Sequence, residues 1–332
     1  MKKKFSSLLR ALFSIGLMVL FTWLAFRGQN ISRIWTSITN VHWLWFVGLF
    51  IGGLLSHLFR AWRWKYLLYP IKQNISMRNA FSALMIGYMI NGIFPRLGEL
   101  VRPYAIKKTE EISGSAALGT VVLERILDII TFALIVFTVL ALNGKTFVLW
   151  FPSMVNLEWL FFTASILLFV IFIFVFLKVE TAFSFLKKMS SFAPAKYKSR
   201  VNEIFDSFIN GFQASKHPGN FFMIGVTSIL TWLSYIILLY IPFFAFGMGN
   251  LDFGAATVLQ VASGLAFAIP TPNGIGSYHS FTLFTLTQLY HVEANSALSY
   301  AVYTHAVGFL STLLAGLYFM VRDNIHLSDV TK

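Results

Sequence analysis

Residues 221–246 decide the fold class, and they read FFMIGVTSILTWLSYIILLYIPFFAF. None of these residues is charged, and about 20 apolar residues in a helix are enough to cross the hydrocarbon core of a bilayer. A surface helix of a soluble domain would carry polar residues along one face instead. The stretch therefore predicts a transmembrane helix, and with it an all-α membrane protein.

The rest of the chain repeats this pattern. Of its 332 residues, 57% are hydrophobic and 12% are charged, which is about half the charged fraction of an ordinary soluble domain. We expect one polytopic transmembrane domain over residues 1–332. The predicted full crossings are residues 11–26, 43–59, 116–142, 159–177, 221–246 and 295–320.

Two shorter apolar runs, residues 80–94 and 253–269, each lead into a break rich in proline and glycine. Both runs are too short to cross a bilayer comfortably, which predicts broken or re-entrant helices. They occupy similar places in the two halves and enter from opposite sides in the predicted topology. This is the arrangement of an inverted repeat around a midplane site, although hydropathy alone also allows a chance resemblance.

The charges are unequal, with 26 Lys and Arg against 13 Asp and Glu, a net charge of +13. Most basic residues lie in residues 1–10, 59–112 and 178–218, which predicts that both termini are cytoplasmic in a bacterial-type inner membrane. The surplus suits an anionic lipid surface. It does not suit nucleic acid, since no basic stripe belongs to a soluble module. With no cysteine and only scattered histidines, we expect no metal and no cofactor.

Residues 178–218 form the one sizeable polar segment. Within it, apolar residues follow helical spacing at Val201, Ile204, Phe205, Phe208, Ile209 and Phe212. The spacing predicts an amphipathic helix. It would lie on the cytoplasmic leaflet or pack against the underside of the bundle.

The first break brings ionisable residues to one irregular turn. Its candidate binding residues are Asn91, Pro95, Arg96, Gly98, Glu99 and Arg102. A guanidinium donates two parallel hydrogen bonds to phosphate and stays charged when partly desolvated, so we expect Arg96 and Arg102 to hold a lipid phosphate while Glu99 orients one of them. The alternative is a plain ion pair at the membrane interface, with arginines that snorkel toward water.

Three further ionisable residues, Glu124, Arg125 and Asp128, lie inside the predicted span 116–142. Each costs roughly 2.5 to 3.5 kcal/mol at bilayer depth if it has no partner, so the three must be compensated. Glu124 and Asp128 share a helix face, and Arg125 can reach Asp128. The spacing allows an internal structural network or a polar cavity that faces the bundle interior.

The second break ends one helix and starts another near Ser277. Its candidate binding residues are Pro270, Pro272, Asn273, Gly274, Gly276, Ser277 and His279. The free N–H groups of a helix start attract anions, and His279 adds a group able to change charge near neutral pH. A packed histidine without such a role is the other interpretation.

These three motifs together resemble the flippase-like membrane domain of lysylphosphatidylglycerol synthases, from about the first span to residue 320. In the bifunctional synthases this domain is linked to moving aminoacylated phospholipid between leaflets, while a separate domain attaches the amino acid. We expect no such catalytic domain in this chain of 332 residues, so the resemblance implies transport without synthesis. Many relatives have glycine at the place of Asn273 and an acidic residue at that of His279, and any role of that acid is not carried over.

The function expected from the motifs and the resemblance is a lipid flippase or scramblase rather than an enzyme. Its substrate would be an anionic, aminoacylated or polyprenyl phospholipid. Two alternatives stay open: a membrane-embedded lipid-modifying enzyme that uses Glu124, Asp128 and His279, and an accessory scaffold for a lipid or glycan biosynthetic enzyme. The sequence does not indicate an oligomeric state.

Overall fold

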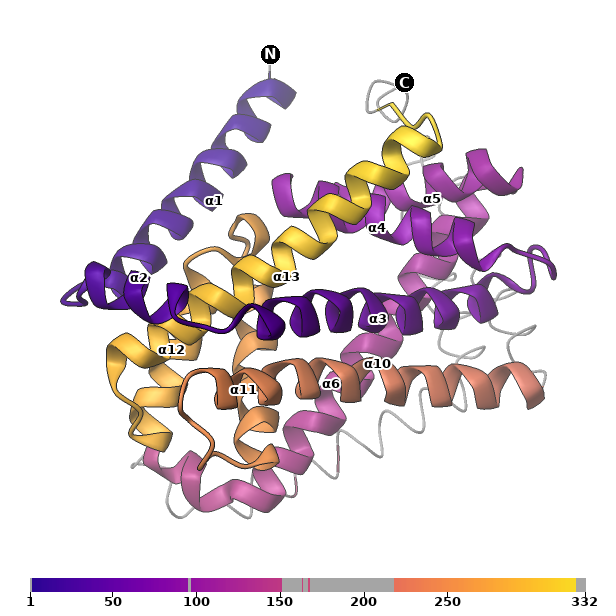
Figure 1. The fold of residues 1–332 in the computed structure, drawn as a ribbon. Coiled ribbons are helices and arrows are strands. Elements are labelled where there is room, and N and C mark those ends of the chain that lie inside the picture. The colour runs from indigo at the N-terminus through magenta and orange to yellow at the C-terminus, as the bar shows by residue number, and fades with distance from the viewer. Residues whose placement is uncertain (1, 95–96, 151–162, 164–166, 168–217, 327–332) are drawn as a thin grey trace. The chain divides into compact units, whose positions relative to one another are not determined.

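The structure is a computed structural model that describes residues 2–94, 97–150, 163, 167 and 218–326 (Figure 1). Within these residues all regular structure is helical and no strand occurs. The helices are α1 (Lys2–Phe26), α2 (Ile31–Thr39), α3 (Trp43–Leu68), α4 (Met77–Ile93), α5 (Gly98–Glu110), α6 (Gly114–Trp150), α10 (Pro218–Ala245), α11 (Phe253–Ala268), the short 3-10 helix η3 (Pro272–Gly274), α12 (Ser277–Tyr290) and α13 (Ala294–Arg322). The prediction of an all-α membrane protein is confirmed.

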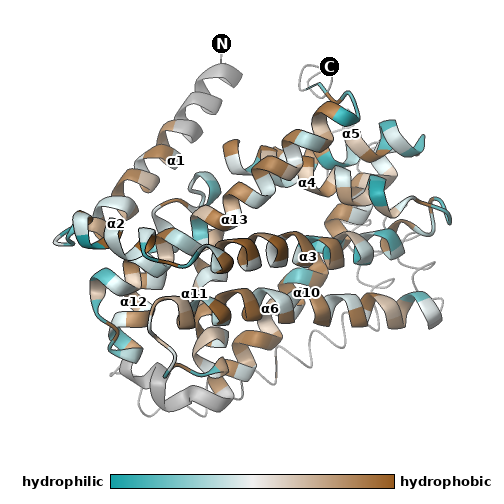
Figure 2. Ribbon diagram, viewed as in Figure 1, coloured by the Kyte–Doolittle hydropathy of each residue, from teal (hydrophilic) through white to brown (hydrophobic). Residues whose placement is uncertain are grey.

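Several helices are long and apolar enough to cross a membrane. Among the described residues these are Trp43–Leu68, Gly219–Ala245 and Ala294–Arg322, and brown dominates α3 and α10 in Figure 2. A fourth candidate is Leu12–Phe26 together with Ile31–Thr39, two helices bent by 87° at a short break. The predicted crossing 116–142 lies within α6, which is not among these candidate spans of the described residues. Most of the predicted crossing 159–177 and most of the predicted amphipathic segment 178–218 lie outside the described residues.

The two predicted breaks separate helices. The first lies between α4 and α5, and the second lies between α11 and α12 with η3 inside it. With 17 and 16 residues, α4 and α11 are each about 25 Å long at a rise of 1.5 Å per residue. Since the hydrocarbon core is about 30 Å thick, neither helix spans it alone. That the breaks enter from opposite faces, as an inverted repeat requires, stays a prediction.

The chain divides into two compact units, each with its own packing. Unit 1 comprises Met1–His57, Met85–Gly98 and Trp232–Arg322. Unit 2 comprises Leu58–Leu84, Glu99–Thr231 and Asp323–Lys332. The boundary between the units falls after Gly98, at the first break, whereas the second break belongs wholly to unit 1.

Unit 1 is organised around α12. This helix packs against α11, α13 and α1, and α2 packs against α13; Figure 1 shows α12 and α13 side by side. Its core includes fully buried Phe243, Leu259, Leu286 and Tyr300. The Tyr300 hydroxyl donates to the Leu239 carbonyl oxygen at 2.5 Å, so α13 is joined to α10 by a hydrogen bond as well as by apolar contact.

Candidate functional site

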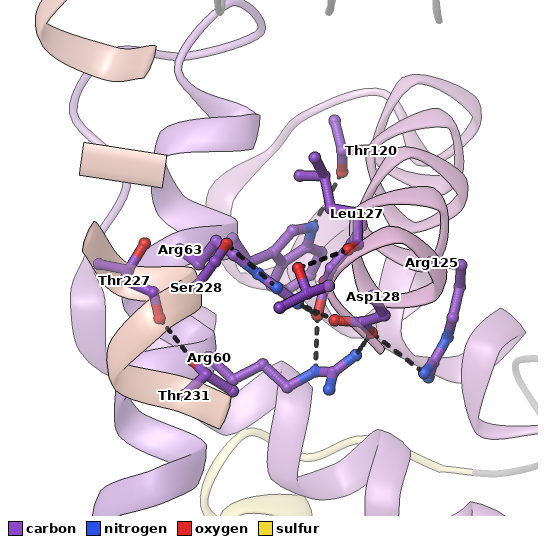
Figure 3. A network of polar contacts seen from close by, with 12 residues as sticks. Arg60, Arg63, Thr120, Arg125, Leu127, Asp128, Thr227, Ser228 and Thr231 are labelled. Carbon is purple, nitrogen blue, oxygen red and sulfur yellow. Dashed lines mark hydrogen bonds and ion pairs between the residues drawn. The ribbon is translucent and has the colours of Figure 1, made fainter. Parts of the chain in front are cut away.

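A buried ionic network lies in unit 2, where α3 meets α6 (Figure 3). Arg60 and Arg63 lie three residues apart on α3, and Glu124 and Asp128 lie four apart on α6. Because residues three or four apart share one helix face, two cations face two carboxylates. Arg60 pairs with Glu124 at 2.6 Å and also with Asp128. Arg63 Nη2 lies 3.2 Å from Glu124 Oε1 and 2.6 Å from Asp128 Oδ1.

The network lies within both helices and not at their ends. Arg60 lies about 12 Å before the end of α3 at Leu68, and Glu124 lies about 15 Å after the start of α6 at Gly114, at 1.5 Å per residue. Charges inside a helix that crosses a membrane would be costly without partners.

Helix α5 joins the network through two crossed ion pairs. Arg102 Nη2 lies 2.6 Å from Glu124 Oε2, and Arg125 Nε lies 3.0 Å from Glu99 Oε1. Helices α5 and α6 thus each contribute one acidic and one basic residue to the ion pairs between them. Arg125 also reaches Asp128 at 3.5 Å, as the spacing on α6 predicts.

Trp64 fixes the position of Arg102. The guanidinium carbon of Arg102 lies 3.6 Å from the centre of the Trp64 ring, a distance at which the ring face attracts a cation. The indole N–H donates to Thr120 Oγ1 at 2.9 Å. Trp64 therefore ties α3 to α5 and α6 at once, and it holds the arginine plane in one orientation.

Burial divides the network into a closed interior and an open edge. The Arg63 and Glu124 side chains are 0% and 1% exposed, whereas Arg125 and Glu99 are 36% and 39% exposed. Inside, each carboxylate meets more than one guanidinium, which offsets the loss of hydration that isolated buried ions suffer. At the edge, the Glu99–Arg125 ion pair is more exposed than the rest of the network.

The sequence predicted part of this arrangement. The residues Glu124, Arg125 and Asp128 do lie together. Glu99, which was expected to orient Arg96 or Arg102, pairs with Arg125. Pro95 and Arg96 lie outside the described residues. Arg60, Arg63 and Trp64 were not among the predicted site residues, because the predicted span ended at residue 59. A usable signal was present, since Arg60 and Arg63 have the spacing that matches two carboxylates on a facing helix.

The first break is closed by Asn91. Its Oδ1 accepts a hydrogen bond from the Gly98 N–H at 2.7 Å. A side chain at position 98 would collide with the Gly87 carbonyl oxygen. A Cβ at Gly92 would lie 2.8 Å from the Phe309 ring and 3.6 Å from Asn273 Oδ1. Within unit 1, the end of α4 thus lies against the second break.

Two histidines hold the backbone of the second break. The Gly276 N–H donates to His279 Nδ1 at 3.3 Å, so this nitrogen carries the lone pair and not a proton. His305 Nε2 lies 2.9 Å from the Asn273 carbonyl oxygen, which can only accept, so this nitrogen carries a proton. The two rings lie 4.9 Å apart. The hydrogen bond that His279 accepts therefore suits a neutral imidazole at that position.

The start of α12 is covered by α1. Helix α12 begins at Ser277, as predicted, but a Cβ at Gly276 would lie 2.7 Å from the backbone of Met18 and of Thr22. Ser14 Oγ donates to the Pro270 carbonyl oxygen at 2.5 Å. The backbone of α1 therefore occupies the space beside Gly276, and the anion site expected at this helix start stays a prediction.

The remaining second-break residues form its turn. Pro272 opens η3, and Asn273 adopts the left-handed conformation with φ of 51°, which asparagine tolerates better than most residues. The hydroxyls of Ser277 and Thr271 lie 2.9 Å apart, and Gly274 O accepts from Ser277 Oγ at 3.2 Å. No cluster of three or more metal-ligating side chains occurs in the described part of the chain.

Fold and site together define a class: an all-helical membrane protein with a buried ionic network and two broken helices. Comparison with known families extends this description. The model of the lysylphosphatidylglycerol synthase TM region matches residues 8–316. The chain belongs to this family, and the resemblance drawn from the sequence motifs is confirmed.

Similar curated proteins are archaeal. A UPF0104 membrane protein of Methanocaldococcus jannaschii is 26% identical over 240 residues, which are 71% of this chain and 95% of that protein. A second one from the same organism is 30% identical over 102 residues, 30% of each chain. A UPF0104 membrane protein of Methanothermobacter thermautotrophicus is 26% identical over 232 residues, 65% of this chain and 67% of that one. No solved structure matches the chain.

Proposed function

We propose that this protein is a lipid translocase, a flippase or scramblase that moves a phosphate-bearing lipid between membrane leaflets. The buried ionic network of unit 2 is the observation that carries the proposal. An arginine fork at bilayer depth is suited to a phosphate, which accepts two parallel hydrogen bonds. Ionisable residues kept inside a membrane despite their cost are by default functional.

Arg102 is the residue best suited to hold the phosphate. Glu124 is already paired with Arg60 and Arg63, so it does not depend on Arg102 for a cation. Arg60 and Arg63 balance Glu124 and Asp128 in charge, and Arg102 adds to that set. The stack on Trp64 orients its planar guanidinium. A headgroup phosphate would bind Arg102 while the lipid tails stay in the bilayer.

The proposed substrates are anionic, aminoacylated and polyprenyl phospholipids. The distribution of basic residues supports a location in the inner membrane with both termini cytoplasmic. In this proposal the chain makes and breaks no covalent bond. A lipid or glycan biosynthetic enzyme that supplies the lipid is the partner we propose.

The test is transbilayer exchange in vesicles. Purified protein is reconstituted with acyl-chain-labelled anionic, lysyl-modified and polyprenyl-phosphate lipids, and the fraction of label accessible from outside is followed over time. We expect at least one lipid to equilibrate faster than in protein-free vesicles, with every lipid recovered chemically unchanged. Absence of exchange for the whole panel by folded protein would refute the proposal. A new lipid product would favour an enzyme instead.

A further inference from the structure

The Glu99–Arg125 ion pair is the part of the ionic network that can exchange partners. Arg125 Nε lies 3.0 Å from Glu99 Oε1, and both side chains are more than one third exposed. Exposed ion pairs contribute little stability, because water competes for both charges. Opening this pair is therefore far easier than separating Arg63 from Asp128 in the closed interior.

An opened pair leaves two opposite charges that both need a partner. A phosphate alone satisfies Arg125 but places a second anion beside Glu99, which is unfavourable in a partly desolvated site. A headgroup with a phosphate and a protonated amine satisfies both residues at once. Binding such a headgroup replaces the Glu99–Arg125 ion pair with two ion pairs, so neither residue is left without a partner.

We propose that Glu99 is a specificity-determining residue that selects headgroups carrying a primary amine next to the phosphate. This inference rests on the proposed translocase function. The phosphate turns toward Arg125 and Arg102, and the amine donates to the Glu99 carboxylate. A quaternary ammonium has no N–H to donate and is accepted less well.

The neighbouring charges give the headgroup one orientation. Arg102 lies on α5 three residues after Glu99, on the same helix face, and pairs with Glu124 in the interior. Arg102 therefore lies on the inner side of the open edge, whereas Glu99 and Arg125 are exposed to a similar degree. A bound headgroup would place its phosphate inward and its amine outward.

A purely structural role for Glu99 makes a different prediction. Glu99 is the acidic residue in the first turn of α5, where a negative charge favours the helix dipole. If stabilising α5 were its only role, replacing Glu99 would change the exchange rate of every lipid by the same factor. If Glu99 determines specificity, replacing it would change the ratio of the exchange rates of different lipids.

The experiment compares acyl-labelled lipids with ethanolamine, choline and glycerol headgroups in the vesicle exchange assay. For the wild type we expect ethanolamine lipid to exchange about tenfold faster than glycerol lipid, as one charge-assisted hydrogen bond allows. Choline lipid should be slower than ethanolamine lipid. Glu99→Gln should bring the ethanolamine-to-glycerol ratio close to one, and Glu111→Gln, at an exposed position in the same region, should leave it unchanged.

A charge-swapped protein, Glu99→Arg with Arg125→Glu, separates the two roles when Glu99→Gln folds poorly. The swap restores the ion pair between positions 99 and 125 but removes the contact of Arg125 with Asp128, so we expect a folded protein of somewhat lower thermal stability with the ethanolamine preference lost. A swapped protein that regains the preference would overturn the inference, as would an unchanged ratio in Glu99→Gln. Equal exchange of all three lipids by the wild type would overturn it and leave the translocase function standing, whereas no exchange at all would refute both.

Discussion

Trp64 lies against the guanidinium of Arg102, with 3.6 Å between the arginine carbon and the centre of the ring. The ring is fully buried, and its N–H is bonded to Thr120. Trp64→Phe removes that hydrogen bond and weakens the cation contact. We expect it to lower the free energy of unfolding by about 2 kcal/mol, measured by thermal unfolding in detergent. Trp62→Phe is the matched control, because Trp62 is partly exposed on the same helix, and equal effects of the two changes would contradict this role.

Glu124 should be the least replaceable member of the network. Glu124→Gln leaves Arg60, Arg63 and Arg102 facing a neutral group, and removing one partner of a buried ion pair costs about 3 to 5 kcal/mol. We expect a large fall in the midpoint of thermal unfolding. Exposed Glu111→Gln should leave the midpoint within error of the wild type. A Glu124→Gln protein as stable as Glu111→Gln would show that the network is not required for folding.

Gly276 should resist any side chain. Its φ is +81°, and a Cβ would lie 2.7 Å from the backbone of Met18 and Thr22. Gly276→Ala should therefore destabilise unit 1 by more than about 1 kcal/mol and should loosen α1, which limited proteolysis near residue 26 would detect. Gly308→Ala is the control, since a Cβ there has nothing within 4 Å and alanine favours a helix by about 0.5 to 1 kcal/mol. Similar behaviour of both variants would refute the packing argument.

Glu110 should make stability depend on acid pH. Burial alone would raise the pKa of Glu110, but hydrogen bonds from Lys72, Ser76 and Asn79 hold that pKa below its ordinary value of 4.5. A carboxyl with a lowered pKa adds stability that is fully present above pH 4.5 and is lost as the pH falls through the folded-state pKa. Below that pKa, wild type and Glu110→Gln should converge in unfolding midpoint, while at pH 7 the wild type should be higher. A constant difference across this pH range would contradict the assignment.

Local features of the sequence predicted the helices and breaks, because hydropathy and proline or glycine act over a few residues. The end of α11 near residue 269 and the start of α12 at Ser277 are examples. The partners of Glu124 and Asp128 could not be identified in the same way. Arg60 and Arg63 follow the apolar run of α3, and only the tertiary contact of α3 with α6 shows that this part of the helix is buried. For the same reason, the sequence did not reveal that α1 covers Gly276.

The most direct test of the central claim is lipid exchange by Arg102→Met. Methionine keeps the apolar contact with Trp64 and leaves Arg60 and Arg63 against Glu124 and Asp128, so we expect the protein to fold. Its unfolding midpoint should be lower than that of the wild type, because the cation contact and the ion pair with Glu124 are lost. Arg78→Met, at an exposed arginine on α4, is the control. If Arg102 holds the lipid phosphate, the exchange rate per folded Arg102→Met protein falls at least about tenfold, while Arg78→Met exchanges at the wild-type rate. Wild-type exchange by folded Arg102→Met would contradict the account.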